Sequence, residues 1–183
     1  MKKIILSVVA IAALAFTTPT FAQKNPMVGG AAMYATKDIV DNAVNSKDHT
    51  TLVAAVKAAG LVETLKSAGP FTVFAPTNAA FKKLPAGTVE TILKPENKAT
   101  LTKILTYHVV AGKMTSKDIA KAIKAGNGKA VFTTVAGGKL TASMNGKKLI
   151  LTDEKGGKST VTIADVMQKN GVIHVIDTVV MPK

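Results

Sequence analysis

Residues 71–81 read Phe71-Thr72-Val73-Phe74-Ala75-Pro76-Thr77-Asn78-Ala79-Ala80-Phe81. The apolar run at its start predicts a strand, which ends at Pro76 because proline has no N–H to donate to a sheet. A side-chain oxygen of Thr77 or Asn78 can then cap a short helix that buries Phe81. This stretch therefore predicts a strand-to-helix corner, with structural roles for Phe74, Pro76, Thr77, Asn78 and Phe81.

The segments around this corner, from 37 to about 124, carry helical signals. Leu52, Val56 and Ala59 are spaced as on the buried face of a helix. Asp48 stands where it could cap that helix, and Gly60 could end it in the left-handed conformation. We predict helices at 38–44, 50–59, 61–68, 87–93, 96–105 and 116–123.

Beyond Gly128 the pattern changes to short apolar segments separated by turn residues. Asn145-Gly146 between alternating apolar residues is a strong hairpin signal, and the apolar segment 172–180 predicts a central strand covered on both sides. We predict strands at 71–74, 108–110, 130–135, 139–144, 148–152, 159–163 and 172–180. This order predicts an α+β domain, with N-terminal helices packed against a mostly antiparallel β-sheet sandwich.

The N-terminus carries the pattern of a cleavable export signal. Lys2 and Lys3 precede an apolar run at 4–16, and Ala22 ends a small-residue cleavage pattern. The run is shorter than the roughly 20 apolar residues of a membrane-spanning helix. We therefore predict a signal peptide at 1–22, an extended lead at 23–36 and one domain at 37–183. The predicted location is periplasmic or extracellular, and the sequence leaves both open.

Composition excludes several kinds of site. Cysteine is absent, which excludes disulfides, thiol nucleophiles and thiolate metal ligands. The 24 basic residues are all lysine, and with 11 acidic residues the net charge is +13. Removing Lys2 and Lys3 with the signal peptide leaves a net charge of 13 − 2 = +11. The lack of arginine and tryptophan argues against sequence-specific recognition of nucleic acid. A lysine-rich exterior can attract anionic glycans or lipid headgroups, or can simply be a solvated surface.

Two further stretches resemble known signatures. Tyr107-His108-Val109-Val110 is similar to a tyrosine-histidine element, and 170–177, Asn170-Gly171-Val172-Ile173-His174-Val175-Ile176-Asp177, runs on towards Met181-Pro182. Together with 71–81 they resemble the ordered signatures of the fasciclin domain family, over 37–182. Asn170, Gly171, His174 and Asp177 belong to these structural signatures, and we expect Asn170-Gly171 to form a turn with positive backbone angles.

The resemblance implies a fasciclin-like fold and a binding role. Members of this family, including periostin-like adhesion proteins, are secreted or surface proteins that bind cells or matrix. Adhesion or envelope association, without catalysis or cofactor, is therefore the implied function. The residues that correspond to contact positions of animal members are Leu105, Tyr107, His108, Val109, Val110, Asp165, Val166 and Met167. Val166 replaces the isoleucine of the animal motif, which argues against an integrin partner.

The chemistry-bearing side chains favour structural roles. His108 and His174 lie in apolar, strand-like segments, where we expect hydrogen-bonded core histidines, and His49 is expected to cap a helix or face solvent. Neither a helical zinc pair nor a calcium loop is present in the sequence, so no metal site is predicted. Asp177 is expected to bond backbone amides or a neighbouring histidine. The alternative is a periplasmic carrier or enzyme with a cleft between helices and sheet, suggested by the 47% apolar content and seven methionines.

Overall fold

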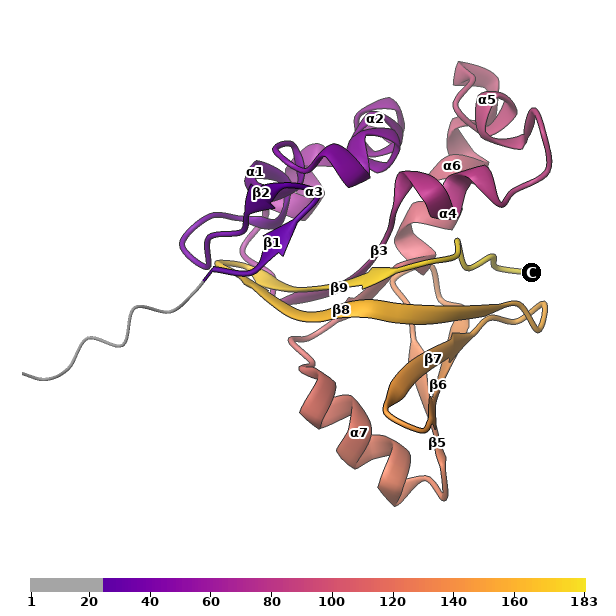
Figure 1. The fold of residues 1–183 in the computed structure, drawn as a ribbon. Coiled ribbons are helices and arrows are strands. Elements are labelled where there is room, and N and C mark those ends of the chain that lie inside the picture. Colours follow the sequence, from indigo (N-terminus) through magenta and orange to yellow (C-terminus); the bar gives the residue numbers. More distant parts are fainter. Residues whose placement is uncertain (1–24) are drawn as a thin grey trace, which may run out of the picture.

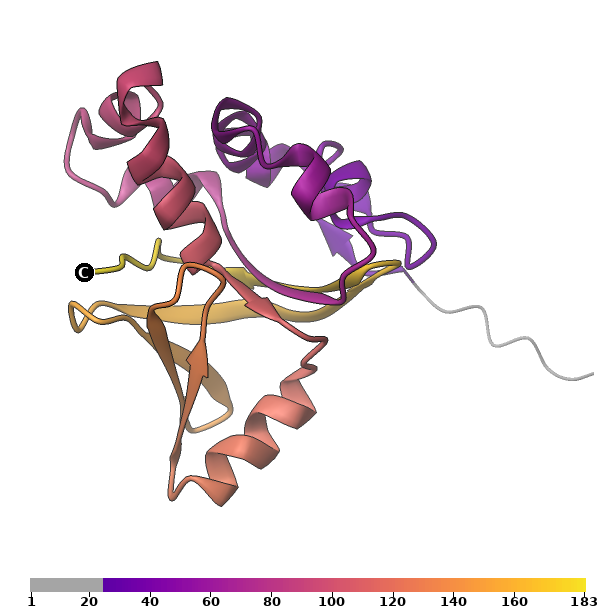
Figure 2. The same ribbon diagram turned by 180° about the vertical axis from the view of Figure 1, so that it is seen from behind.

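The computed structural model describes residues 25–183. The signal peptide predicted at 1–22 lies outside the described residues. The fold is built on one strongly bent sheet, with α1 to α6 on one side of β3, β9 and β8, and with β5 to β7 and α7 on the other (Figure 1 and, from behind, Figure 2). This arrangement confirms the predicted α+β class with helices packed against a mostly antiparallel sheet.

The main sheet has seven strands in the order β4-β3-β9-β8-β7-β6-β5. Only β3 and β9 pair in parallel, and the other neighbours are antiparallel. A single bridge between Val110 and Thr134 joins its two edges, so the sheet is nearly closed. The strands are β3 Phe71–Pro76, β4 Val109–Ala111, β5 Lys129–Thr133, β6 Lys139–Asn145, β7 Lys148–Thr152, β8 Lys158–Gln168 and β9 Gly171–Ile176.

The helices follow the caps and stops in the sequence. Thr77 caps the helix after the corner, because its side chain accepts a hydrogen bond from the Ala80 N–H, and Phe81 is buried as predicted. Gly60 ends α2 with a φ of 74°. Asp48 does not cap α2 but lies in a 3-10 turn, Lys47–His49. The helices are α1 Ile39–Ala43, α2 Thr50–Ala59, α3 Val62–Lys66, α4 Asn78–Lys82, α5 Thr88–Ile92, α6 Lys98–Tyr107 and α7 Ser116–Ala125, with a second 3-10 turn at Pro95–Asn97.

Two apolar cores lie on opposite faces of the sheet. The first is formed by α1 to α6 on β3 and β9, and the second fills the concave side under α7. Strand β9 is buried along its whole length, as predicted for a central strand. Side chains from α7 and the sheet meet in the second core, which includes Phe74, Tyr107, Ile119, Leu140, Leu151 and Ile176.

Three segments differ from the sequence predictions. The lead predicted at 23–36 contains a hairpin of β1 Met27–Val28 and β2 Ala31–Ala32, and Val28 is buried in the first core. Strand β8 continues past 163 to Gln168, because an irregularity at Asp165, with φ of 59°, lets it rejoin β9. Strand β9 ends at Ile176 rather than 180.

The turn at Asn170-Gly171 has no positive φ, so that part of the prediction is wrong. Glycine fits at 171 for another reason: a Cβ there would lie 2.1 Å from the carbonyl oxygen of Phe71 on the neighbouring strand. Asn170 accepts a hydrogen bond from the Ile39 N–H at 3.1 Å and donates to the Leu65 carbonyl at 2.7 Å. Asn170 therefore ties α1 and α3 to the turn before β9.

Candidate functional site

The tyrosine-histidine element lies inside the molecule. Tyr107 ends α6 and is 0% exposed, and its hydroxyl donates to the Lys139 carbonyl at 2.7 Å and accepts from the Glu154 N–H at 3.2 Å. Burial raises the pKa of this phenol. The remaining residues of the element are buried as well, namely Leu105, His108, Val109 and Val110. These five predicted contact residues are thus placed to hold α6 against the sheet.

His108 is a hydrogen-bonded core histidine. Its Nδ1 lies 2.8 Å from the Ile104 carbonyl, and its Nε2 accepts from the Val180 N–H at 3.2 Å. This pairing requires the proton on Nδ1, because a carbonyl can only accept. Burial lowers the pKa of His108 to about 4. The ring is therefore neutral at physiological pH and joins α6 to the C-terminal segment, which agrees with the structural role predicted for it.

The second predicted motif lies where β8 bends. The carboxylate of Asp165 accepts from the Ser116 N–H at 2.6 Å and from the Ser116 hydroxyl, which fastens it to the start of α7. Val166 is buried, whereas Asp165 and Met167 are half-buried. The sequence motif therefore reaches the surface at Asp165, and it does so at the N-terminus of a helix that lies 49 residues earlier in the chain.

His174 contacts the junction between Asp165 and the start of α7. Its Nδ1 lies 3.4 Å from the Asp165 N–H, and its Nε2 lies 2.9 Å from the Met114 carbonyl. The ring is fully buried and packs against Phe74, with 5.6 Å between ring centroids. Burial lowers the pKa of His174, so the ring is neutral. His174 is thus a buried, hydrogen-bonded ring that links β9, β8 and the segment before α7.

A surface groove of about 400 Å³ lies beside this junction, between α7 and strands β6 to β8. Ser116 and Ala164 place the Asp165 motif at its edge, and Lys117 and Lys147 line it as well. Its other lining residues are Ala120, Met144, Leu149, Val161 and Thr162. The groove is therefore lined by apolar side chains together with the hydroxyls of Ser116 and Thr162 and two lysine side chains.

Lysines continue from this groove along the exposed side of α7. Lys117, Lys121 and Lys124 follow the i, i+4, i+7 spacing of one helix face, while Ile119 and Ile123 are buried on the other. Lys147 and Lys148 are exposed at the turn between β6 and β7. No ion pair between residues of 25–183 involves any of these five lysines. We call Lys117, Lys121, Lys124, Lys147 and Lys148 the α7 lysine face.

Hydrogen bonds cap the start of α7, the helix that carries these lysines. Thr115 and Asp118 form a reciprocal capping box at its start, in which the Asp118 N–H bonds the Thr115 hydroxyl and the Asp118 carboxylate accepts from the Thr115 N–H. These hydrogen bonds lower the pKa of Asp118. Sequence reasoning predicted this helix but did not identify its lysine face, although the three-residue and four-residue spacings of Lys117, Lys121 and Lys124 were visible.

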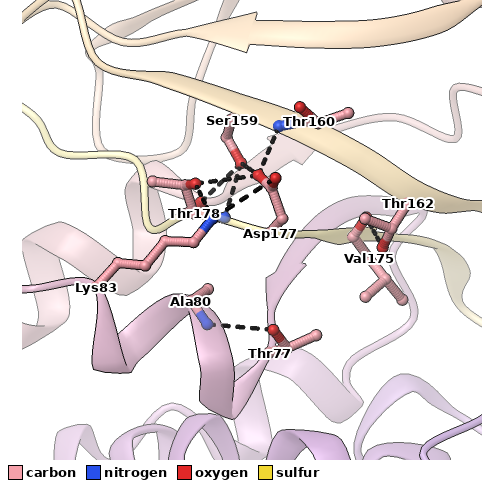
Figure 3. Close-up of polar contacts among 9 residues, drawn as sticks. All are labelled: Thr77, Ala80, Lys83, Ser159, Thr160, Thr162, Val175, Asp177 and Thr178. Carbon is pink, nitrogen blue, oxygen red and sulfur yellow. Dashed lines mark hydrogen bonds and ion pairs between the residues drawn. The ribbon is translucent and has the colours of Figure 1, made fainter.

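Asp177 directly follows the last residue of β9, Ile176, and lies beside Lys83, Thr160 and Thr178 (Figure 3). Its carboxylate accepts from the Thr160 N–H at 2.8 Å and from the Thr178 hydroxyl at 3.0 Å, and Lys83 Nζ lies 3.6 Å away. Partial burial alone would raise the pKa of Asp177, but these hydrogen bonds and the Lys83 charge outweigh it, so the pKa lies below its ordinary value. The bond to a backbone amide agrees with the role predicted for this residue.

The prediction that His49 caps a helix or faces solvent is wrong. Its side chain is only 3% exposed, and its Nδ1 lies 2.9 Å from the Ser46 hydroxyl. It occupies the N-cap position of α2, yet its side chain makes no capping bond. The neighbouring residues do not indicate this burial, because His49 stands between polar side chains.

Comparisons with known proteins agree with these features. The model of the fasciclin domain matches residues 47–182. The chain belongs to the fasciclin domain family. As a fasciclin domain it is 46% identical over 185 residues to "Protein sll1483" of Synechocystis, covering 97% of this chain and 96% of that protein. It is also 36% identical over 168 residues to the "Cell surface glycolipoprotein MPB83" of Mycobacterium bovis, covering 88% of this chain and 69% of that protein.

A solved structure shares the fasciclin fold. The domain pair of the insect cell adhesion molecule Fasciclin I superposes with a TM-score of 0.68 at 19% identity, covering 78% of this chain and 50% of that chain. Two findings complete the description. No helix in the described part of the chain is long and apolar enough to cross a membrane, and within residues 25–183 no cluster of three or more acidic or histidine side chains is placed to hold a metal ion.

Proposed function

We propose that this fasciclin domain is an exported, non-catalytic binding module that attaches to an anionic component of the cell envelope or surrounding matrix. One relative is named a cell surface glycolipoprotein and the structural neighbour is a cell adhesion molecule, which supports a surface role. The signal predicted at 1–22 would deliver the domain to the periplasm or the extracellular medium. The partner in this proposal is an acidic surface protein or an anionic glycan.

The observation that carries the proposal is the α7 lysine face. Five exposed lysines without ion-pair partners in the described structure lie on one helix face and an adjacent turn. Lysine is a flexible point charge rather than a rigid fork, so such a surface attracts anions without fixing their geometry. The expected recognition is therefore electrostatic, tolerant of sequence and weakened by salt.

In this proposal the family's contact residues act from beneath the surface. Tyr107 and His108 position α6 on the sheet, and Asp165 fixes the start of α7 through Ser116. Each bond helps to hold the two halves of the molecule in one arrangement. Asp165, Val166 and Met167 are then positioning residues for the lysine face, and the groove beside them is the place where an apolar group of the partner can enter.

Co-sedimentation with envelopes isolated from the producing cell tests this function. We expect the purified domain to sediment with envelopes at low salt and to be released progressively as salt is raised, because screening shortens the reach of exposed charges to about 10 Å at 0.1 M. Envelopes treated with protease or with glycan-degrading enzymes identify the class of partner. Absence of sedimentation at every salt concentration would contradict the proposal.

A further inference from the structure

A second site lies on the other face of the sheet, between α1, α2 and α3 and strands β3 and β9. A cavity of about 90 Å³ opens there within the first core. Its walls are almost entirely apolar and include Val40, Leu52, Val56, Leu65, Val73 and Ile173. This is the cleft between helices and sheet that the sequence suggested as an alternative. Helices α1 to α3, which line it, lie across β3, β9 and β8 from α7 (Figure 1).

One polar group in this wall lacks a partner. His49 lines the cavity, and among the described residues its Nε2 has no hydrogen-bond partner although it is fully buried. The Ser46 hydroxyl lies 2.9 Å from the other ring nitrogen, Nδ1, and forms a hydrogen bond with it. Burial lowers the pKa of His49, and the nearby Ala75 carbonyl and Asp48 charge oppose this without reversing it, so the ring is neutral.

A buried polar group without a partner destabilises the fold, so it is a natural anchor for a ligand. A neutral imidazole nitrogen either donates or accepts, and the contact with Ser46 fits both tautomers. A hydroxyl group satisfies either state, because it also donates and accepts. The rest of the wall offers only dispersion contacts, which favour an uncharged hydrocarbon.

The volume limits what can enter. A dry cavity of about 150 Å³ accommodates benzene, so the present 90 Å³ holds roughly four heavy atoms. Exposed residues also contribute to the lining, namely Lys57, Thr64 and Val135, and they mark where the cavity meets solvent. A longer chain could therefore enter by one end only.

We propose that this cavity binds the hydroxyl-bearing end of an aliphatic molecule, with the hydroxyl on His49 Nε2 and the hydrocarbon against the apolar wall. The ligand is either a small alcohol or the terminal group of a longer hydroxylated chain. This site is independent of the lysine face, and its failure would leave the proposed envelope binding untouched.

Titration with 1-propanol, whose four heavy atoms match the cavity, tests this site, followed by NMR shifts of the His49 ring and of the Val73 and Ile173 methyl groups. We expect saturable shifts in the wild-type protein, and about tenfold weaker binding in His49→Leu, which loses the hydrogen bond but keeps an apolar wall. Xenon, which needs no hydrogen bond, should bind both proteins equally. Should His49→Leu not fold, the wild-type shifts alone decide, together with crystals soaked in 1-propanol.

The chain length of the probe separates the two sources of ligand. Tighter binding of 1-octanol than of 1-propanol would support the end of a longer chain, and equal binding would support a small alcohol. Shifts that do not saturate, or density in soaked crystals that shows only an ordered water on Nε2, would overturn the assignment.

Discussion

At the scale of single residues, buried polar side chains make specific hydrogen bonds that connect separate elements of the fold. Asn170 connects α1 and α3 to the turn before β9, His108 connects α6 to Val180, and Asp177 holds the strand end through Thr160. The sequence predicted structural roles for these three residues because each interrupts or closes an apolar segment. It could not predict the burial of His49, because that depends on helices and strands that come together only in the folded chain.

The buried histidines make stability depend on pH. The folded-state pKa of His108 is about 4, against an ordinary value of 6.5. The unfolded chain therefore binds more protons than the folded chain, and stability falls as pH drops below 6.5. We expect His108 alone to cost about 3 kcal/mol by pH 4, with His49 and His174 adding in the same direction.

Urea unfolding followed by circular dichroism between pH 7.5 and 5 checks this prediction. The carboxylates with lowered pKa titrate below this range, so the slope reports the histidines. The variant His108→Gln should be less stable at pH 7.5, but its dependence on pH should be shallower by about one proton. A free energy of unfolding that stays constant across this range would count against buried, neutral histidines.

At the scale of elements, the departures from the sequence predictions have local causes. The sequence does not predict strand β8 past 163, because Asp165 adopts a left-handed backbone conformation that interrupts the alternation of side chains along the strand. Aspartate tolerates this conformation better than most residues do. Strands β1 and β2 are too short to show the alternation of apolar and polar residues that indicates a strand. The other strands and α7 were predictable because turns at Gly137-Gly138, Asn145-Gly146 and Gly156-Gly157 separate them.

The bond between Asp165 and Ser116 is expected to anchor α7. Asp165→Asn keeps the size of the side chain and tolerates the left-handed backbone, but it removes the charge that both Ser116 bonds use. We expect a loss of about 1–2 kcal/mol in the free energy of unfolding. Amide exchange at 116–119 should become faster, while exchange within α2 should change little. Equal acceleration in both helices would show a global rather than a local effect.

At the scale of the whole molecule, one bent sheet separates two faces, each of which carries one candidate binding site. Helices α1, α2 and α3 line the cavity with His49 on one face, and α7 carries its lysines on the other. The sequence predicted the α+β class and the packing of N-terminal helices against a mostly antiparallel sheet, but not the near closure of the sheet. That closure rests on a single bridge between Val110 and Thr134, and no local pattern marks such a pair.

The central claim is that the α7 lysine face binds the envelope. Two variants with the same change in net charge test it: Lys117→Gln with Lys121→Gln and Lys124→Gln, and a control with Lys82→Gln, Lys98→Gln and Lys155→Gln on other exposed parts of the molecule. Sedimentation with isolated envelopes at low salt is the measurement. We predict that the α7 variant loses at least about tenfold in affinity, which corresponds to 1.4 kcal/mol, whereas the control binds nearly as the wild type does. Equal losses in both variants would contradict a specific face and leave only a general effect of net charge.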